Sequence, residues 1–277
     1  MNIKKASKCF GYSRQYYYIL LHKNKIWYDL EKLIVGIILD LRKNNHKYGM
    51  DKTYYYLRDT FRAAGIKIGR DKLRNIMRRN GLKLKVKRRA RYTQPIALQD
   101  AENKMYGIDL YKPNQVWFAD ITYLKTEENG MVRLALVMDG YSRRILSYEL
   151  GNGPAIATKA LKKAMTYGQP EIHHSDRGID YVNDGYTYLL KNNEVTISFS
   201  RAGVPQDNGI MERTIGILKN ELKLKMSKNI DELKKKIEEV ISFYNDRRIH
   251  MSCNYKTPSS IYFKNYFVNQ NCQLILA

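Results

Sequence analysis

The stretch 116-VWFADITYL-124 decides how the second half of the chain folds. It is rich in β-branched and aromatic residues, which favour an extended strand over a helix. Asp120 lies in the middle of this strand, where most of its neighbours are apolar. An unpaired buried carboxylate is strongly destabilising, so a bound cation would account for an acid at this place. We therefore expect a strand that carries a functional carboxylate.

The residues that follow predict a mixed sheet. Two more segments of strand composition come after short joints, which predicts an antiparallel meander, and helices and strands then alternate. The expected strands are 116–124, 132–138, 144–150, 171–174 and 195–200, and the expected helices are about 155–167, 183–192, 207–225 and 231–244. This order predicts an α/β, ribonuclease-H-like fold: a mixed five-stranded sheet with flanking helices.

The front of the chain differs in charge and in pattern. Residues 1–95 carry 25 Lys and Arg against 6 Asp and Glu, whereas the remainder is nearly neutral. Apolar residues recur at helical spacing in three short segments, which predicts a small all-α helix-turn-helix domain. The expected domains are an N-terminal helical segment at 1–30, a helix-turn-helix DNA-binding domain at 31–82, a basic linker at 83–112 and a catalytic core with C-terminal helices at 113–277.

Such an excess of positive charge indicates a polyanionic partner, and double-stranded DNA is the one we expect. A general solubilising charge and attraction to an acidic membrane surface are the alternatives, but no amphipathic anchor accompanies the charge. The candidate contacts to DNA phosphates are Arg74, Arg78 and Arg79 in the third predicted helix and Lys83, Lys85, Lys87, Arg88, Arg89 and Arg91 in the linker.

Composition argues against several other classes of protein. Cys9, Cys253 and Cys272 are far apart and odd in number, so neither a disulfide framework nor a structural zinc site is expected. The longest apolar run, 33–39, is too short to cross a bilayer. We expect a cytoplasmic, nucleoid-associated protein with no membrane partner.

Two further acids stand out by their positions. Asp176 closes the predicted strand in 173-HHSDRG-178, at the carboxyl end where open α/β sheets tend to place ligands. Glu212 lies on the helix predicted over 207–225, with Asn208 one turn before it and Lys219 two turns after it. Carboxylates suit a pair of hard cations, which activate and stabilise the oxygens of a phosphodiester. For Glu212, a solvated helix flank is the alternative.

Together these residues resemble a known family. Asp120, Asp176 and, after 35 intervening residues, Glu212 are similar to the DDE motif of retroviral integrases and insertion-sequence transposases, with Lys219 seven positions further on. More narrowly, the chain resembles the second-frame (OrfB-type) transposase of two-frame insertion sequences. Five blocks occur in that family's order: HKYGMDKTYYYLRD…IMRRNGLK, WFADITY, HHSDRG, DNGIMER…LKNEL and YNDRRIHMSCNYKTP.

The resemblance implies a DNA transposase that catalyses metal-dependent strand cleavage and strand transfer. Asp120, Asp176 and Glu212 would be its catalytic residues and would bind two Mg²⁺ ions, for which Mn²⁺ can substitute. Lys219 and Asn208 would lie against the DNA. Arg247 and His250 match the closing block, where packing of the final helices is an equal candidate for their role.

The family also implies partners. These are the DNA of the element ends and of the target, further copies of this chain in a homo-oligomer on DNA, and an upstream-frame (OrfA-type) subunit or fusion. The sequence departs from the family at Ala119, where a threonine is common, and at Asp180, where an amide is frequent. An extra carboxylate at Asp180 would perturb a metal site.

Other functions remain as alternatives. A ribonuclease-H-like nuclease or resolvase would cleave strands without joining them, and a non-enzymatic DNA-binding regulator would not need the carboxylates. A tyrosine recombinase would find a nucleophile among the 23 tyrosines. However, the Arg/His/Arg/Tyr set that such a recombinase requires is not apparent.

Overall fold

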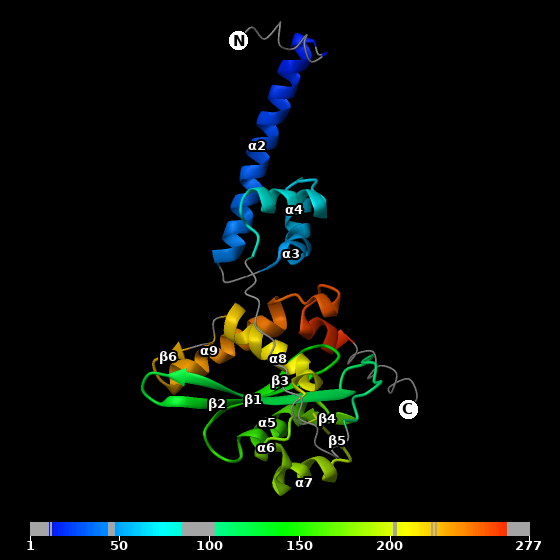
Figure 1. Cartoon of the computed structure of the whole chain (residues 1–277), viewed down its shortest axis with the longest axis vertical. Helices are drawn as coiled ribbons and strands as arrows, with labels where there is room; N and C mark the ends of the chain where they lie inside the picture. Colours follow the sequence, from blue (N-terminus) through cyan, green and yellow to red (C-terminus); the bar gives the residue numbers. More distant parts are fainter. Residues whose placement is uncertain are drawn as a thin grey trace. The chain divides into compact units, whose positions relative to one another are not determined.

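The computed structural model describes residues 11, 13–43, 48–84, 103–201, 204–222, 224 and 226–264 (Figure 1). The chain divides into two compact units, Met1–Lys87 and Arg88–Ala277. Five of the predicted DNA contacts lie outside the described residues: Lys85, Lys87, Arg88, Arg89 and Arg91. The boundaries of the four predicted domains stay predictions.

The described part of the first unit is helical, with α2 (Arg14–Lys43), α3 (Met50–Ala63) and α4 (Arg70–Arg79). The helix predicted around 33–41 belongs to the longer α2, which passes the predicted boundary at residue 30 because no Gly or Pro interrupts residues 14–35. Only Ile34, Ile38 and Leu41 of α2 are buried. Neither α2 nor any other described helix is apolar enough over a sufficient length to span a bilayer.

The core of this unit forms where the three helices meet. Leu73, Ile76 and Met77 of α4 are fully buried, as their spacing predicted. Glycines in the left-handed region end two of the helices: Gly65 (φ +69°) follows α3, and Gly81 (φ +66°) follows α4. After each, a backbone N–H bonds back five residues at 2.8 Å, which closes the helix end tightly. The predicted helix ends are therefore confirmed.

The second unit contains the predicted mixed sheet. Its strands are β1 (Val116–Thr126), β2 (Gly130–Asp139), β3 (Ile145–Gly151), β4 (Ile172–Ser175) and β5 (Thr196–Phe199), with a two-residue β6 (Met226–Ser227) beside β1. The order is β3-β2-β1-β4-β5, antiparallel from β3 to β1 and parallel from β1 to β5. This topology confirms the ribonuclease-H-like fold.

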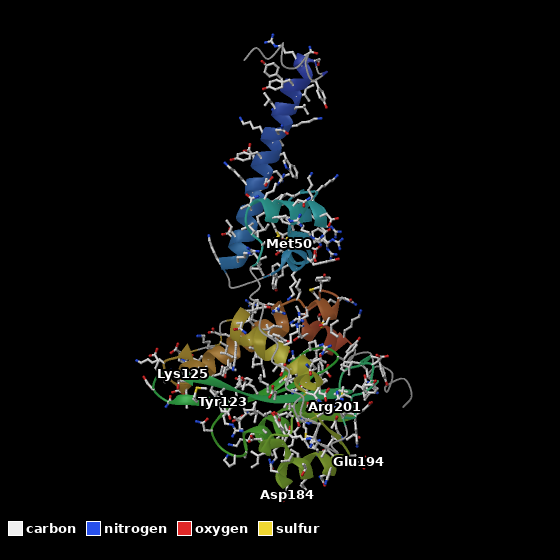
Figure 2. All side chains as sticks on the ribbon, viewed as in Figure 1. Met50, Tyr123, Lys125, Asp184, Glu194 and Arg201 are labelled. Carbon is white, nitrogen blue, oxygen red and sulfur yellow. The ribbon has the colours of Figure 1, made fainter. Side chains whose placement is uncertain are left out.

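Helices cover both faces of the sheet (Figure 1). On one face lie α5 (Ile156–Ala164), α6 (Ile179–Val182) and α7 (Asp184–Asn192), and on the other lie α8 (Gly209–Gly216) and α9 (Ile230–Ser242). Alternate side chains of β1 therefore enter two different cores: Trp117 and Ala119 pack with α5 and α7, whereas Val116 and Phe118 pack with α8 and α9. By this alternation Asp120 belongs to the α8 face. Figure 2 shows Asp184 and Glu194 on the α7 side.

The long helix predicted over 207–225 is divided in the structure. Pro205–Asn208 forms a 3₁₀ turn, α8 covers only Gly209–Gly216, and Ile217–Glu221 continues as the π-helical turn η3. Glycine at both ends of α8 weakens the regular hydrogen-bonding pattern, and the wider turn brings Leu218 into the core. Lys219 consequently follows Glu212 on a helix of changed pitch, not on the uniform α-helical stripe that the sequence predicted.

Candidate active site

The register of two parallel strands brings Asp120 and Asp176 together. Val116 of β1 pairs with Ile172 of β4, and Phe118 pairs with His174. Continuing the same register by two residues places Asp176, just beyond the end of β4, next to Asp120. Neighbouring strands lie about 4.8 Å apart. Residues two apart along a strand share a face, so Asp120 lies on the face of Phe118 and Asp176 on the face of its partner His174. Both carboxylates are therefore on the α8 face of the sheet.

Glu212 reaches this face from α8. Met211 and Thr214 on either side of it are buried in the core, which fixes the rotation of the helix, while Glu212 itself is exposed. The three acids influence one another, because the negative charges of Asp176 and Glu212 both raise the pKa of Asp120. The predicted carboxylates, 35 residues and more apart in sequence, therefore lie within electrostatic range of one position on the sheet.

Asp120 has the most altered acidity of the three. Burial raises its pKa to about 7, with the charge of Asp176 as the next contribution. The Ile121 N–H donates to its Oδ1 at 2.8 Å, and this bond and the positive charge of Lys219 act in the opposite direction. Without a cation, Asp120 thus carries a proton over part of the neutral range, and a cation that displaces the proton would restore its charge.

The chemistry of the available donors fits a hard cation. Three carboxylates offer only oxygen ligands, as Mg²⁺ and Mn²⁺ prefer. Within the described ranges no three His, Cys, Asp or Glu side chains are already spaced as a metal cluster. The burial and raised pKa of Asp120 are the observation that fits a cation here.

The two histidines beside Asp176 do not contribute ligands. His173 points to the α7 face, where its Nε2 lies 2.9 Å from the Tyr186 hydroxyl, and burial lowers its pKa to about 3. His174 lies between the hydroxyls of Ser198 and Ser200, at 2.9 and 3.0 Å, and burial lowers its pKa as well. His173 thus connects β4 to α7, and His174 connects β4 to Ser198 of β5 and to Ser200 just after it.

A tight turn presents Asp176. Its Oδ1 accepts the Gly178 N–H at 2.9 Å, and a Cβ at Gly178 would lie only 3.0 Å from that oxygen. Asp180, the departure from the family pattern, forms an ion pair with Arg133 of β2. The extra carboxylate is thereby neutralised, and α6 is attached to the sheet. The sequence analysis missed Arg133, because nothing near it in sequence indicates its partner 47 residues away.

Lys219 and Asn208 both bond to β1 beside Asp120. The Lys219 ammonium donates to the Tyr123 carbonyl at 2.7 Å; burial lowers its pKa, and the charge of Asp120 raises it. Asn208 is only 5% exposed and donates to the Ala119 carbonyl at 3.2 Å. In this structure Asn208 fixes the start of α8 to β1. A DNA contact by Asn208 stays a prediction that requires it to leave this bond.

We expect Lys219→Gln to weaken DNA binding and to shift the pH dependence of cleavage. Loss of one charged contact lowers the affinity for element-end DNA about tenfold. Loss of the positive charge also raises the pKa of Asp120 further, so the pH midpoint of metal-dependent cleavage moves upward. The KM for DNA and the pH profile measure the two effects. Lys125→Gln is the control, because Lys125 is an exposed lysine on β1, the strand that carries Asp120. Unchanged values for Lys219→Gln would contradict this role.

The closing block has a structural role in the described chain. His250 is 6% exposed and packs its ring against Tyr244 and the Arg248 guanidinium. Arg248, which the sequence analysis did not single out, is 2% exposed and its Nε donates to Glu221 at 3.1 Å. Arg247 is exposed. These contacts favour packing for His250, and a functional role for Arg247 stays a prediction.

In the first unit, two of the predicted DNA contacts are engaged within the protein. Arg74 donates to Asp51 at 2.7 Å, and Arg79 donates to Glu31 at 2.8 Å. Arg78 and Lys83 are exposed. The structure therefore leaves Arg78 and Lys83 accessible, while Arg74 and Arg79 would have to exchange an acid for a phosphate.

Comparison with known proteins identifies the family. Integrase core domain models match residues 111–205 and 193–258. A 31 kDa protein of insertion element IS600 from Shigella sonnei is 35% identical over 209 residues, which cover 71% of this chain and 75% of that protein. A putative transposase of insertion sequence element IS150 from Escherichia coli is 30% identical over 255 residues, covering 88% and 87%.

Among solved structures, the catalytic core domain of HTLV-2 integrase in complex with magnesium is similar with a TM-score of 0.44 and 20% identity. The match covers 55% of this chain and 97% of that one. The sequence relatives show the family, and they do not favour the nuclease, resolvase or regulator alternatives. The chain belongs to the insertion-sequence transposases: it is a DNA transposase of the polynucleotidyl-transferase type, built on an integrase core domain.

Proposed function

We propose that Asp120, Asp176 and Glu212 are the catalytic residues of this transposase and bind two Mg²⁺ ions, for which Mn²⁺ can substitute. The observation that carries the proposal is Asp120, a half-buried carboxylate on the central strand whose pKa is raised to about 7 beside two other acids. A site that holds like charges this close without a cation is destabilised. Clustered carboxylates of raised pKa are typical of functional sites.

The proposed reaction has two steps, a hydrolysis followed by a transesterification. Water first attacks the phosphodiester at the element end, and the bond from phosphorus to the 3′ oxygen breaks, which leaves a 3′-hydroxyl on the element. That hydroxyl then attacks a phosphodiester of the target, whose own 3′ oxygen leaves. Bound divalent cations would activate the attacking oxygen and stabilise the leaving oxygen. No covalent bond to the protein is needed in either step.

The protein's own residues have distinct parts in this scheme. Asp120 must lose its proton before it can bind a cation, and Lys219 favours that loss because its positive charge lowers the pKa of Asp120. Asn208 and the Gly178 N–H hold α8 and Asp176 in position. With its ammonium held at β1, Lys219 would place a DNA phosphate beside the carboxylates.

We further propose how the chain assembles on DNA. The helical first unit, with its excess of Lys and Arg, would bind double-stranded DNA at the element ends or the target, and phosphate contacts would supply most of the affinity. Several copies would act together, with an upstream-frame (OrfA-type) subunit or fusion contributing end recognition. The nucleoid is the proposed site of action.

The test uses end-labelled DNA that carries the terminal inverted repeat of the element. The purified chain, alone and fused to its upstream frame, is incubated with this DNA in Mg²⁺, in Mn²⁺ and in EDTA. We expect a strand nicked at the element end, and strand-transfer products with target DNA, in both metals and not in EDTA. Cleavage in EDTA, or cleavage without any joining by either protein, would contradict the proposal.

A further inference from the structure

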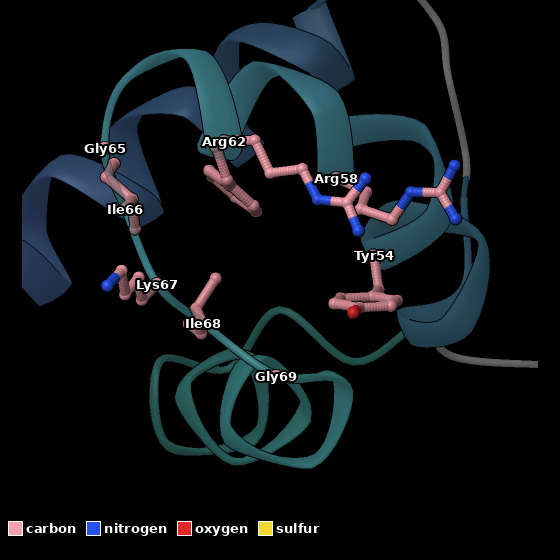
Figure 3. A pocket seen from close by; sticks show the side chains of 9 residues that line it. Tyr54, Arg58, Arg62, Gly65, Ile66, Lys67, Ile68 and Gly69 are labelled. Atoms are coloured by element: carbon pink, nitrogen blue, oxygen red, sulfur yellow. The ribbon is translucent and has the colours of Figure 1, made fainter.

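A pocket with a basic lining lies in the first unit, which contains none of the residues assigned to the reaction (Figure 3). It has a volume of about 520 Å³ and is formed by α3 from Tyr54 onward and by the turn 65–69 that leads into α4. Arg58, Arg62 and Lys67 supply three positive charges, Tyr54 supplies a ring with a hydroxyl, and Phe61 and Ile68 supply apolar surface. No acidic residue lines it.

The two arginines are only weakly neutralised. Arg58 Nε and Arg62 Nη1 lie 3.4 and 3.5 Å from the same oxygen of Asp59, at the limit of a hydrogen bond. One exposed carboxylate therefore serves two guanidinium groups, which together have many more N–H donors than one oxygen can accept. Figure 3 shows both guanidinium groups on the side of the pocket where the Tyr54 ring lies.

This arrangement differs from that of the arginines on α4. There Arg74 is held by Asp51 at 2.7 Å and Arg79 by Glu31 at 2.8 Å. Charge-assisted pairs of this length are close to optimal, so Arg74 and Arg79 have strong partners within the protein. Arg58 and Arg62, by contrast, extend donors toward an open cavity. The amino end of α4, which has no side-chain cap, adds partial positive charge at the same place.

We propose that this pocket binds the backbone of duplex DNA, with one phosphate between Arg58 and Arg62. The adjoining deoxyribose would lie against Phe61 and Ile68, and the Tyr54 hydroxyl and Lys67 would reach the flanking phosphates. The cavity is larger than one phosphate needs and suits a sugar-phosphate unit. The inference rests on the proposed function only in taking DNA as the ligand of the first unit. It assigns the anchoring contacts to α3 and its turn, in addition to α4.

The test is DNA binding by the full chain in EDTA, measured as a function of salt. We expect the double variant Arg58→Gln, Arg62→Gln to bind a labelled duplex about tenfold more weakly near physiological salt, with a salt dependence lower by roughly two released ions. Lys23→Gln with Lys25→Gln, two exposed lysines on α2, removes the same charge outside the pocket. An equal loss in both double variants would mean that only net charge matters and would overturn the proposal.

A second variant tests the shape of the pocket independently of its positive charge. Ile68→Trp fills the cavity and leaves all charges in place, and we expect it to lower the affinity at least about fivefold while thermal unfolding stays near that of the parent. Wild-type binding by Ile68→Trp would overturn the proposal. Because phosphate contacts carry no sequence information, the losses should be equal on unrelated duplexes, and a loss confined to one sequence would also overturn it.

The same assay keeps this inference separate from the catalytic proposal. Asp176→Asn should bind DNA normally in EDTA although its cleavage in Mg²⁺ is about a thousandfold slower. The Arg58, Arg62 double variant should bind poorly and recover cleavage at high DNA concentration. Normal binding by the double variant would refute the pocket alone. Normal cleavage by Asp176→Asn would refute the metal site alone.

Discussion

Asp176→Asn is expected to lower the rate of strand cleavage and of strand transfer about a thousandfold, which corresponds to roughly 4 kcal/mol of lost transition-state stabilisation. An amide is a poor ligand for a hard cation compared with a carboxylate. The substitution is otherwise conservative, because Asp176 is exposed and an asparagine oxygen can still accept the Gly178 N–H. The fold should therefore be unchanged.

The measurement is single-turnover cleavage of element-end DNA in Mg²⁺, with circular dichroism to confirm folding. Asp184→Asn is the matched control, since Asp184 is an exposed acid of the same unit on the opposite face of the sheet (Figure 2). It should leave the rate within about twofold of the parent. If both substitutions have the same small effect, the carboxylate beside Asp120 is not a metal ligand.

Asp120→Asn is expected to abolish cleavage and, at the same time, to stabilise the metal-free protein above pH 7. Burial raises the pKa of Asp120 from its ordinary value of 3.8 to about 7 in the folded chain. The folded state thus holds this proton more tightly than the unfolded state does, so the contribution of Asp120 to stability is full below pH 4 and is lost as the pH rises toward 7. An amide cannot ionise and avoids this loss.

The free energy of unfolding of Asp120→Asn is expected to exceed that of the parent by at most about 4 kcal/mol at pH 8 and by close to zero at pH 4. Urea unfolding of both proteins in EDTA, from pH 4 to pH 8, measures the difference. Mg²⁺ should then stabilise the parent at pH 8 more than it stabilises the variant, because the variant lacks the Asp120 carboxylate whose proton the cation replaces. Parallel stability curves from pH 4 to pH 8 would show that Asp120 has an ordinary acidity.

The fold could be predicted from the sequence because its strands are marked locally. The composition of 116–124 and the alternation after it predicted β1 to β3, and the structure has them within a few residues. The middle of a strand is also where an acid is least expected, which singled out Asp120. Those features depend on neighbours in sequence, and a single sequence displays them.

The features that the sequence did not predict depend mostly on contacts between residues far apart in the chain. The alignment of Asp120 with Asp176 follows from the register of β1 with β4, which alternation alone does not give. The pairing of Arg133 with Asp180 and of Arg248 with Glu221 leaves no local signal, since each arginine looks like any other basic residue in this chain. The division of the 207–225 helix was missed for a different reason: apolar spacing is continuous through the π-helical turn.

The contact between Arg248 and Glu221 makes the turn that follows α8 depend on a residue much later in the chain. Glu221 closes the turn that carries Lys219, and its counter-charge comes from a residue 27 positions later. A copy of the gene interrupted anywhere between those two codons would still encode all three acids that we propose as catalytic. In the truncated protein Glu221 would lack the Arg248 guanidinium, and the turn that carries Lys219 would lose this contact. We therefore expect the truncated protein to have no transposase activity although all three acids are present.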